Sequence, residues 1–226
     1  MGRDNHPRER QARQLARKQG RREPFDRVLI VCEGSKTEPL YFEELRAYYR
    51  LNTANVVVQH SQYGTSPLQV VEFARDRLLT GDPHTRLPPG AFDRVYAVFD
   101  RDQHESYHAA LALAQTLDGK LKNDDKKAVR FEAIASVPCF ELWLLLHFED
   151  VHAPLDRNEA FSQLRTHLAA YEKGSGGHFE QTRMKLGDAL GRAQKLATLH
   201  SREDGRAPLT DVAKLVEWLV SIKPLG

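Results

Sequence analysis

Two strand-like runs of apolar residues in this chain end in acidic residues. The first run covers Arg27–Glu33, and the second covers Asp93–Asp102. Both are nearly continuous in β-branched, aromatic and small apolar side chains, which is typical of strands buried on both faces of a parallel sheet. In open α/β sheets the carboxyl ends of such strands line the ligand crevice. The pattern therefore predicts acidic side chains at a sheet edge where ligands bind.

Further strands and helices alternate with these two runs over the first 150 residues. Additional strands are expected at residues 56–59 and 128–136, and helices at about 35–49, 66–79, 105–117 and 138–148. Two of the helix starts carry a local signal, because Ser35 and Glu38 have the spacing of a capping box, and Ser66 precedes Pro67. Strand–helix alternation predicts an α/β fold, a parallel sheet flanked by helices with right-handed crossovers.

Beyond residue 150 the pattern changes to helices alone. They are expected at about residues 157–171, 182–199 and 209–222, with no convincing strand among them. The glycine-rich segment 173–177 is too irregular to match a phosphate-binding P-loop. We therefore predict three parts, which are a flexible basic arm at 1–24, an α/β domain at 25–150 and a helical C-terminal subdomain at 151–226.

Composition narrows the class of protein. The chain of 226 residues is 41% hydrophobic and 28% charged, which is typical of a globular protein. No apolar run approaches the roughly 20 residues of a membrane span, and the N-terminus has no apolar signal core. We therefore expect a cytoplasmic protein with no membrane partner. The two cysteines, Cys32 and Cys139, stand in no paired metal-ligand motif, which argues against structural zinc.

The small net charge of +2 conceals a basic N-terminus. Residues 1–24 hold eight Arg and Lys residues and three acidic residues. One interpretation is an arm that neutralises the phosphates of a nucleic acid, and the other is a solubilising tail. For Lys173, farther along the chain, phosphate contact competes with a solvent-exposed helix face. The candidate nucleic-acid-binding residues are Arg13, Arg17, Lys18, Arg21, Arg22 and Lys173.

Glu33, Asp100 and Asp102 are candidate ligands of a hard metal ion. Carboxylates that converge at one sheet edge repel one another unless a cation neutralises them, and Mg²⁺ or Mn²⁺ prefers oxygen ligands. Residues two apart in an extended chain point to the same side, so Asp100 and Asp102 could share one ion if the strand runs that far. The alternative is that each acid is only a helix cap or a turn residue.

Three blocks of sequence resemble the motifs of the RloB-like (AbiLii-like) bacterial proteins. Residues 32–42 read Cys-Glu-Gly-x-x-Thr-Glu-x-x-Tyr-Phe, and residues 99–102 read Phe-Asp-x-Asp. Residues 136–148 read Ser-x-Pro-x-Phe-Glu-x-Trp-Leu-x-x-His-Phe. The blocks follow the order of that family, whereas the helical C-terminal part resembles it only loosely.

The resemblance implies a TOPRIM-like fold and metal-dependent action on phosphodiesters in bacterial phage defence, often beside an ATPase encoded nearby. It implies that Asp100 and Asp102 bind Mg²⁺ and that Glu33 completes the shell or acts as general acid or base through a water. Gly34 would allow a phosphate or metal to approach the backbone. Glu141 is either a third acid of the site or an acid that favours a helix N-terminus. Glu38 is either an acid of the site or the glutamate of the capping box, and the capping box is the favoured interpretation.

Two functions from different classes follow. The first is a metal-dependent nuclease that cuts RNA, such as tRNA, or DNA, as an effector of abortive infection. The second is a non-catalytic TOPRIM-like binding or sensor subunit that regulates a partner ATPase. The chain has no Walker-type Lys-Ser/Thr motif, so we do not expect it to hydrolyse ATP alone. Strand passage by a topoisomerase would need further domains and a nucleophilic tyrosine.

Deleting residues 1–24 should weaken binding to nucleic acid and flatten its salt dependence. Each lost phosphate contact should reduce the slope of log affinity against log salt by about 0.9 for duplex DNA. Binding isotherms at four or more salt concentrations measure that slope. An unchanged slope would show that the arm does not contact phosphates.

Overall fold

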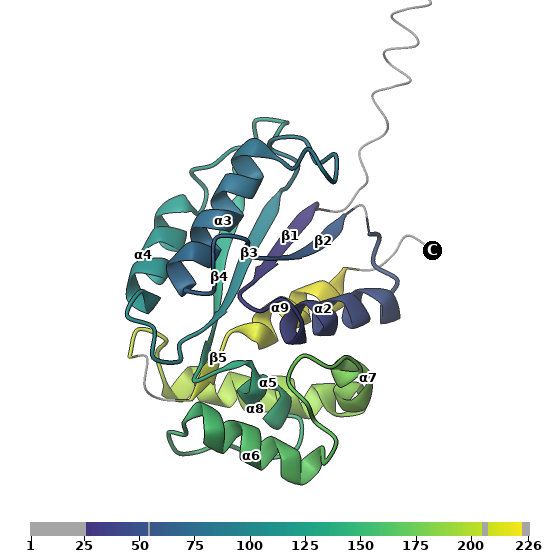
Figure 1. Ribbon diagram of the computed structural model, residues 1–226, viewed down its shortest axis with the longest axis vertical. Coiled ribbons are helices and arrows are strands. Elements are labelled where there is room, and N and C mark those ends of the chain that lie inside the picture. Colours follow the sequence, from purple (N-terminus) through teal and green to yellow (C-terminus); the bar gives the residue numbers. More distant parts are fainter. Residues whose placement is uncertain (1–25, 54, 205–207, 223–226) are drawn as a thin grey trace, which may run out of the picture.

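One mixed sheet forms the centre of the computed structural model, which describes residues 26–53, 55–204 and 208–222 (Figure 1). Its strands are β1 Val28–Cys32, β2 Val56–His60, β3 Arg94–Asp100, β4 Arg130–Val137 and β5 Leu209–Thr210. Their order across the sheet is β2-β1-β3-β4-β5. The four longer strands are parallel, and β5 pairs antiparallel with β4. The order is that of doubly wound sheets, which reverse direction between β1 and β3.

Helices cover both faces of the sheet. They are α2 Thr37–Tyr48, α3 Pro67–Thr80, α4 Tyr107–Leu117, α5 Phe140–Leu145, α6 Arg157–His167, α7 His178–Thr182, the 3₁₀ turn η1 Arg183–Lys185, α8 Leu186–Leu199 and α9 Val212–Ser221. Helices α3 and α4 lie on one side, and α2 and α9 lie on the other, with α5 to α8 gathered beyond one end of the sheet (Figure 1). Within the described residues, none is long and apolar enough to cross a membrane.

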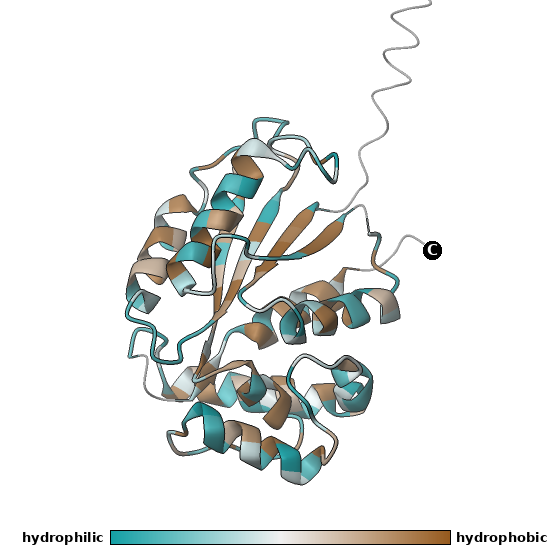
Figure 2. Cartoon of the chain, viewed as in Figure 1, coloured by the Kyte–Doolittle hydropathy of each residue, from teal (hydrophilic) through white to brown (hydrophobic). Residues whose placement is uncertain are grey.

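The alternation of side chains along each strand supplies both halves of the core. Val28, Ile30 and Cys32 of β1 join one buried cluster with α2, α5, α8 and α9. Leu29 and Val31 join a second cluster with α3 and α4. All five side chains are fully buried, and the strands are hydrophobic over most of their length in Figure 2. Burial on both faces explains why the strands read as continuous apolar runs.

The first of these clusters extends across residue 150. It contains Ile30 of the sheet and Trp143 of α5 together with Leu164 of α6, Leu196 of α8 and Leu215 of α9. The helical C-terminal portion therefore packs on the sheet through a shared core. The division at residue 150 into domain and subdomain stays a prediction.

The fold class expected from the sequence is confirmed as a mostly parallel α/β sheet flanked by helices. The predicted start of α3 is also confirmed. The Ser66 hydroxyl accepts the Gln69 backbone N–H at 3.4 Å, and Gln69 Oε1 accepts the Ser66 N–H at 3.3 Å. This reciprocal pair satisfies two N–H groups that a helix end would otherwise leave unpaired.

Several predicted boundaries were wrong. Helix α2 has Lys36 as its N-cap, without a side-chain hydrogen bond, so Ser35 and Glu38 form no capping box. The last predicted helix begins at Val212, because Leu209–Thr210 forms the short strand β5. A strand of two residues is too short for hydrophobic alternation to reveal. The helix predicted at 157–171 ends at His167. The helix predicted at 182–199 begins at Leu186.

Replacing Ser66 with Ala should lower the free energy of unfolding by about 1 kcal/mol, because α3 loses its cap. Ser35→Ala is the matched control, since Ser35 is exposed and caps no helix. It should change the free energy of unfolding by less than about 0.5 kcal/mol. Urea melts of the two variants compare them directly, and equal losses would contradict the assigned caps.

Candidate functional site

The strand order brings Glu33 and Asp100 together. Glu33 directly follows β1, and Asp100 is the last residue of β3, the strand beside it. The Glu33 backbone N–H donates to the Val98 carbonyl at 2.9 Å, which keeps the two strand ends level. The Asp100 N–H then donates to Glu33 Oε2 at 2.9 Å. The two acids meet where the sheet reverses its winding, the usual position of the ligand crevice in such folds.

Asp100 lies deep in this edge, with only 3% of its surface exposed. Burial raises the pKa of Asp100 well above its usual value, and the charges of Glu38, Glu33 and Glu141 raise that pKa further. Burial also raises the pKa of Glu33, although the hydrogen bond from the Asp100 N–H opposes that shift. Both pKa values are raised because water and nearby cations neutralise only part of the negative charge at this edge.

Glu38 belongs to this acidic edge, contrary to its interpretation as a helix cap. It lies in the first turn of α2 and is only 6% exposed. Burial, together with the nearby charges of Glu33 and Glu141, raises the pKa of Glu38 to about 7. Its carboxylate also explains Gly34, because a Cβ at Gly34 would lie 2.5 Å from Glu38 Oε2. Glu38 is thus the group that approaches Gly34 in this structure, and the approach of a phosphate or metal to Gly34 stays a prediction.

Glu141 reaches the same edge from the first turn of α5. Its side chain is 2% exposed, and Oε1 accepts the Tyr171 hydroxyl at 3.0 Å. Lys173 Nζ lies 3.9 Å from the same oxygen. Oε2 is buried without a hydrogen-bond partner, and a buried acceptor left unpaired costs about 1–3 kcal/mol. Glu141 is therefore both an acid at a helix N-terminus and a member of the acidic cluster.

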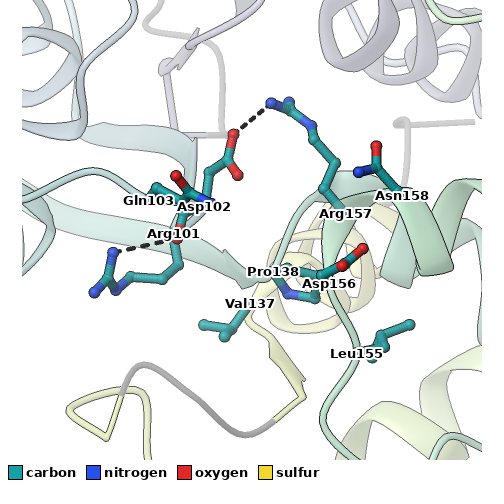
Figure 3. A pocket seen from close by; sticks show the side chains of 9 residues that line it. All are labelled: Arg101, Asp102, Gln103, Val137, Pro138, Leu155, Asp156, Arg157 and Asn158. Atoms are coloured by element: carbon teal, nitrogen blue, oxygen red, sulfur yellow. Dashed lines mark hydrogen bonds and ion pairs between the residues drawn. The ribbon is translucent and has the colours of Figure 1, made fainter.

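Asp102 is held by an arginine that was not among the candidate residues. The strand ends at Asp100, and Asp102 lies in a turn with φ of 36°, so strand alternation does not align the two side chains. Arg157 aligns them instead. Its Nη1 pairs with Asp102 Oδ2 (Figure 3), and its Nη2 lies 3.4 Å from Asp100 Oδ2.

Arg157 owes its place to the start of α6. Asp156 caps this helix by accepting the Glu159 N–H at 2.9 Å, so Arg157 is its first helical residue. The Asp-x-x-Glu spacing at 156–159 could have predicted the helix start. Nothing local could have predicted the partner, which lies 55 residues earlier in the chain. His104 was likewise missed as a neighbour of the site, with its Nε2 3.8 Å from Glu33 Oε1.

The predicted nucleic-acid-binding residues cannot all be placed. Arg13, Arg17, Lys18, Arg21 and Arg22 lie outside the described residues. Lys173 lies in a turn after α6, not on a helix face, and its ammonium group faces the acidic edge through Glu141.

The donor set of this edge fits a hard divalent cation in its chemistry. It consists of the carboxylates of Glu33, Glu38, Asp100, Asp102 and Glu141. Among the described residues, however, no group of three or more His, Cys, Asp or Glu side chains is arranged to hold a metal ion as it stands. Magnesium ions commonly take only one or two protein carboxylates and keep several waters, so three preformed ligands are not required.

The two cysteines near the site are buried and free. Burial is the largest of the causes that raise the pKa of the two thiols. The neutral thiol is a poor nucleophile and a poor metal ligand. Cys32 and Cys139 therefore act as small packing residues beside the acidic cluster.

Fold and site together define a doubly wound α/β protein with a buried carboxylate cluster at the switch point of its sheet. The sequence matches the family described as RloB-like protein over residues 28–219. The chain belongs to the RloB-like family. No curated protein and no solved structure matches it.

In metal-free buffer the free energy of unfolding should fall as pH rises from about 4.5 to about 7. The pKa of Glu38 is raised from 4.5 to about 7 by folding, so the protonated form stabilises the native state and that contribution is lost as the carboxyl ionises. The change should be at most about 3 kcal/mol. Glu38→Gln should flatten this dependence in urea melts across that range.

The control is Glu132→Gln, which removes a half-exposed carboxylate near the opposite end of β4. It should leave the pH dependence as it is in the wild type. If the free energy of unfolding of Glu38→Gln falls with pH as steeply as that of the wild type, the raised pKa of Glu38 is contradicted.

Proposed function

We propose that this protein is a metal-dependent nuclease that hydrolyses phosphodiesters at the edge formed by Glu33 and Asp100. The observation that carries the proposal is the position of Asp100, buried at a strand end, beside Glu33 and among other carboxylates. A cluster of buried carboxylates in a ligand crevice is costly to a fold, and such costs are concentrated at functional sites.

Mg²⁺ or Mn²⁺ is the cofactor that this donor set suits. Asp100 and Asp102 would hold the ion, with Glu33 either completing its shell or moving a proton through a water. When bound, such an ion polarises a phosphoryl oxygen and activates water. Glu141 lies near Glu38 and Asp100 and adds a further carboxylate, which should favour binding of a cation over binding of a free anion.

The substrate class is a nucleic acid, either RNA such as tRNA or DNA. The basic residues 1–24 would supply affinity independent of sequence through phosphate contacts. Membership in the RloB-like family supports a role as an effector in bacterial phage defence and abortive infection, with an ATPase encoded nearby as a possible partner.

Purified protein should cleave pools of RNA or DNA with Mg²⁺ or Mn²⁺ and should lose this activity with EDTA. Asp100→Asn and Asp102→Asn should each lower the cleavage rate by about a hundredfold or more, because each removes a group that acts on the reacting centre. Gel assays of labelled pools measure the rate, and Glu132→Gln is the matched control that should cleave normally. Cleavage that survives the loss of both aspartates would end the proposal.

One observation favours the second candidate function, a non-catalytic subunit that regulates a partner ATPase. Arg157 already neutralises part of the charge on Asp100 and Asp102, so these two acids have a cationic partner without any metal. Under that function, Glu33→Gln would leave phage defence intact and would leave complex formation with the ATPase unchanged. The nuclease proposal predicts that Glu33→Gln abolishes defence while the complex still forms.

A further inference from the structure

A cavity of about 350 Å³ lies beside the acidic edge. Three segments meet there, namely the turn after β3, the end of β4 and the start of α6 (Figure 3). Its volume is at the lower end of the roughly 300–1,000 Å³ typical of small-ligand pockets, which suits one phosphodiester unit of a single strand. The lining residues are Arg101, Asp102, Gln103, Val137, Pro138, Leu155, Asp156, Arg157 and Asn158.

The polar lining of this cavity suits an anion. Each of its two carboxylates is already engaged, since Asp156 accepts the Glu159 N–H at 2.9 Å and Asp102 is paired with Arg157. The remaining polar lining is cationic or carries amide donors. The Arg101 guanidinium contacts backbone carbonyls, since Nη1 donates to the Asp102 carbonyl at 3.3 Å (Figure 3) and to the His104 carbonyl at 3.0 Å. Arg157 is thus the cation that faces both the cavity and the acids.

Arg157 and a divalent cation would compete for the same carboxylate oxygens. The guanidinium bridges Asp102 and Asp100, which are the two predicted metal ligands. Two cations within about 4 Å of each other repel strongly near a protein surface, so both cannot occupy this position. The Arg157 side chain is 35% exposed and lines the cavity, so it can leave the acids without backbone movement.

We propose that Arg157 has two positions. In the first it neutralises Asp100 and Asp102 in place of a metal ion. In the second it has given up these carboxylates to a divalent cation and has turned into the cavity, where it binds a phosphate of the substrate strand. The planar guanidinium suits this second task, because it makes two parallel hydrogen bonds to phosphate oxygens. This inference rests on the proposed function and names a residue that binds its substrate.

The exchange predicts that loss of Arg157 strengthens the binding of a divalent cation and weakens the binding of nucleic acid. In Arg157→Gln the competing cation is gone, so the Mg²⁺ or Mn²⁺ concentration that gives half-maximal thermal stabilisation should fall about tenfold. The affinity for single-stranded oligonucleotides, measured in Ca²⁺ to limit cleavage, should also fall about tenfold. The slope of log affinity against log salt concentration should flatten by about 0.7, the value for one phosphate contact on a single strand.

Arg157→Lys separates charge from geometry. Lysine keeps the positive charge, so the metal midpoint should stay within about threefold of the wild type. Lysine cannot form the planar pair of hydrogen bonds, so the affinity of Arg157→Lys for oligonucleotides should be about tenfold lower than that of the wild type. Arg202→Gln is the matched control, because Arg202 is also 35% exposed, and it too contacts two acids, Glu203 and Asp211. It should leave both measurements unchanged.

A metal midpoint that is unchanged or higher in Arg157→Gln would overturn the exchange, as would the absence of any metal stabilisation in the wild type. Inorganic phosphate is the second probe. If phosphate alone stabilises the wild type and not Arg157→Gln, while oligonucleotides bind both alike, the cavity takes free phosphate and the assignment to a substrate strand is wrong. If the exchange holds but the wild type cuts no nucleic acid, only the nuclease proposal fails.

Discussion

Repulsion among carboxylates packed into one edge of the sheet is the constraint on which this structure depends. The reversal of strand order puts Glu33 beside Asp100, and the starts of α2 and α5 add Glu38 and Glu141. Burial removes the water that would otherwise screen these charges, so the pKa of each of Glu33, Glu38 and Asp100 is raised. The chain tolerates this arrangement because other segments bring compensating groups to the same place.

Those compensating groups come from the C-terminal part of the chain. Arg157 opens α6, and Tyr171 and Lys173 follow that helix, and all three contact the acids. The loop that carries Lys173 is tied back to α2, because the Gly174 N–H donates to Thr37 Oγ1 at 2.9 Å. The helical portion is therefore part of the site, and removing it would leave the acidic edge without its cations.

The sequence was sufficient for the parts of the fold that repeat locally. Continuous apolar runs predicted the parallel strands, and the acids that end them predicted the sheet edge at which Glu33 and Asp100 meet. Glu38 was misjudged because the Ser-x-x-Glu spacing is the same whether the glutamate caps a helix or turns toward a buried cluster. Arg157 could not be found at all, because packing of α6 against α5 brings it to Asp102 and no neighbouring residue in the sequence signals that contact.

Diffraction from crystals grown with Mn²⁺ tests the central claim most directly, because the anomalous signal of Mn²⁺ locates the ion independently of the refined side chains. The account predicts a peak about 2.1–2.2 Å from a carboxylate oxygen of Asp100, with the Arg157 guanidinium moved away from Asp100 and Asp102. A Mn²⁺-containing crystal with no peak at this edge, and with Arg157 still bridging the two aspartates, would contradict it.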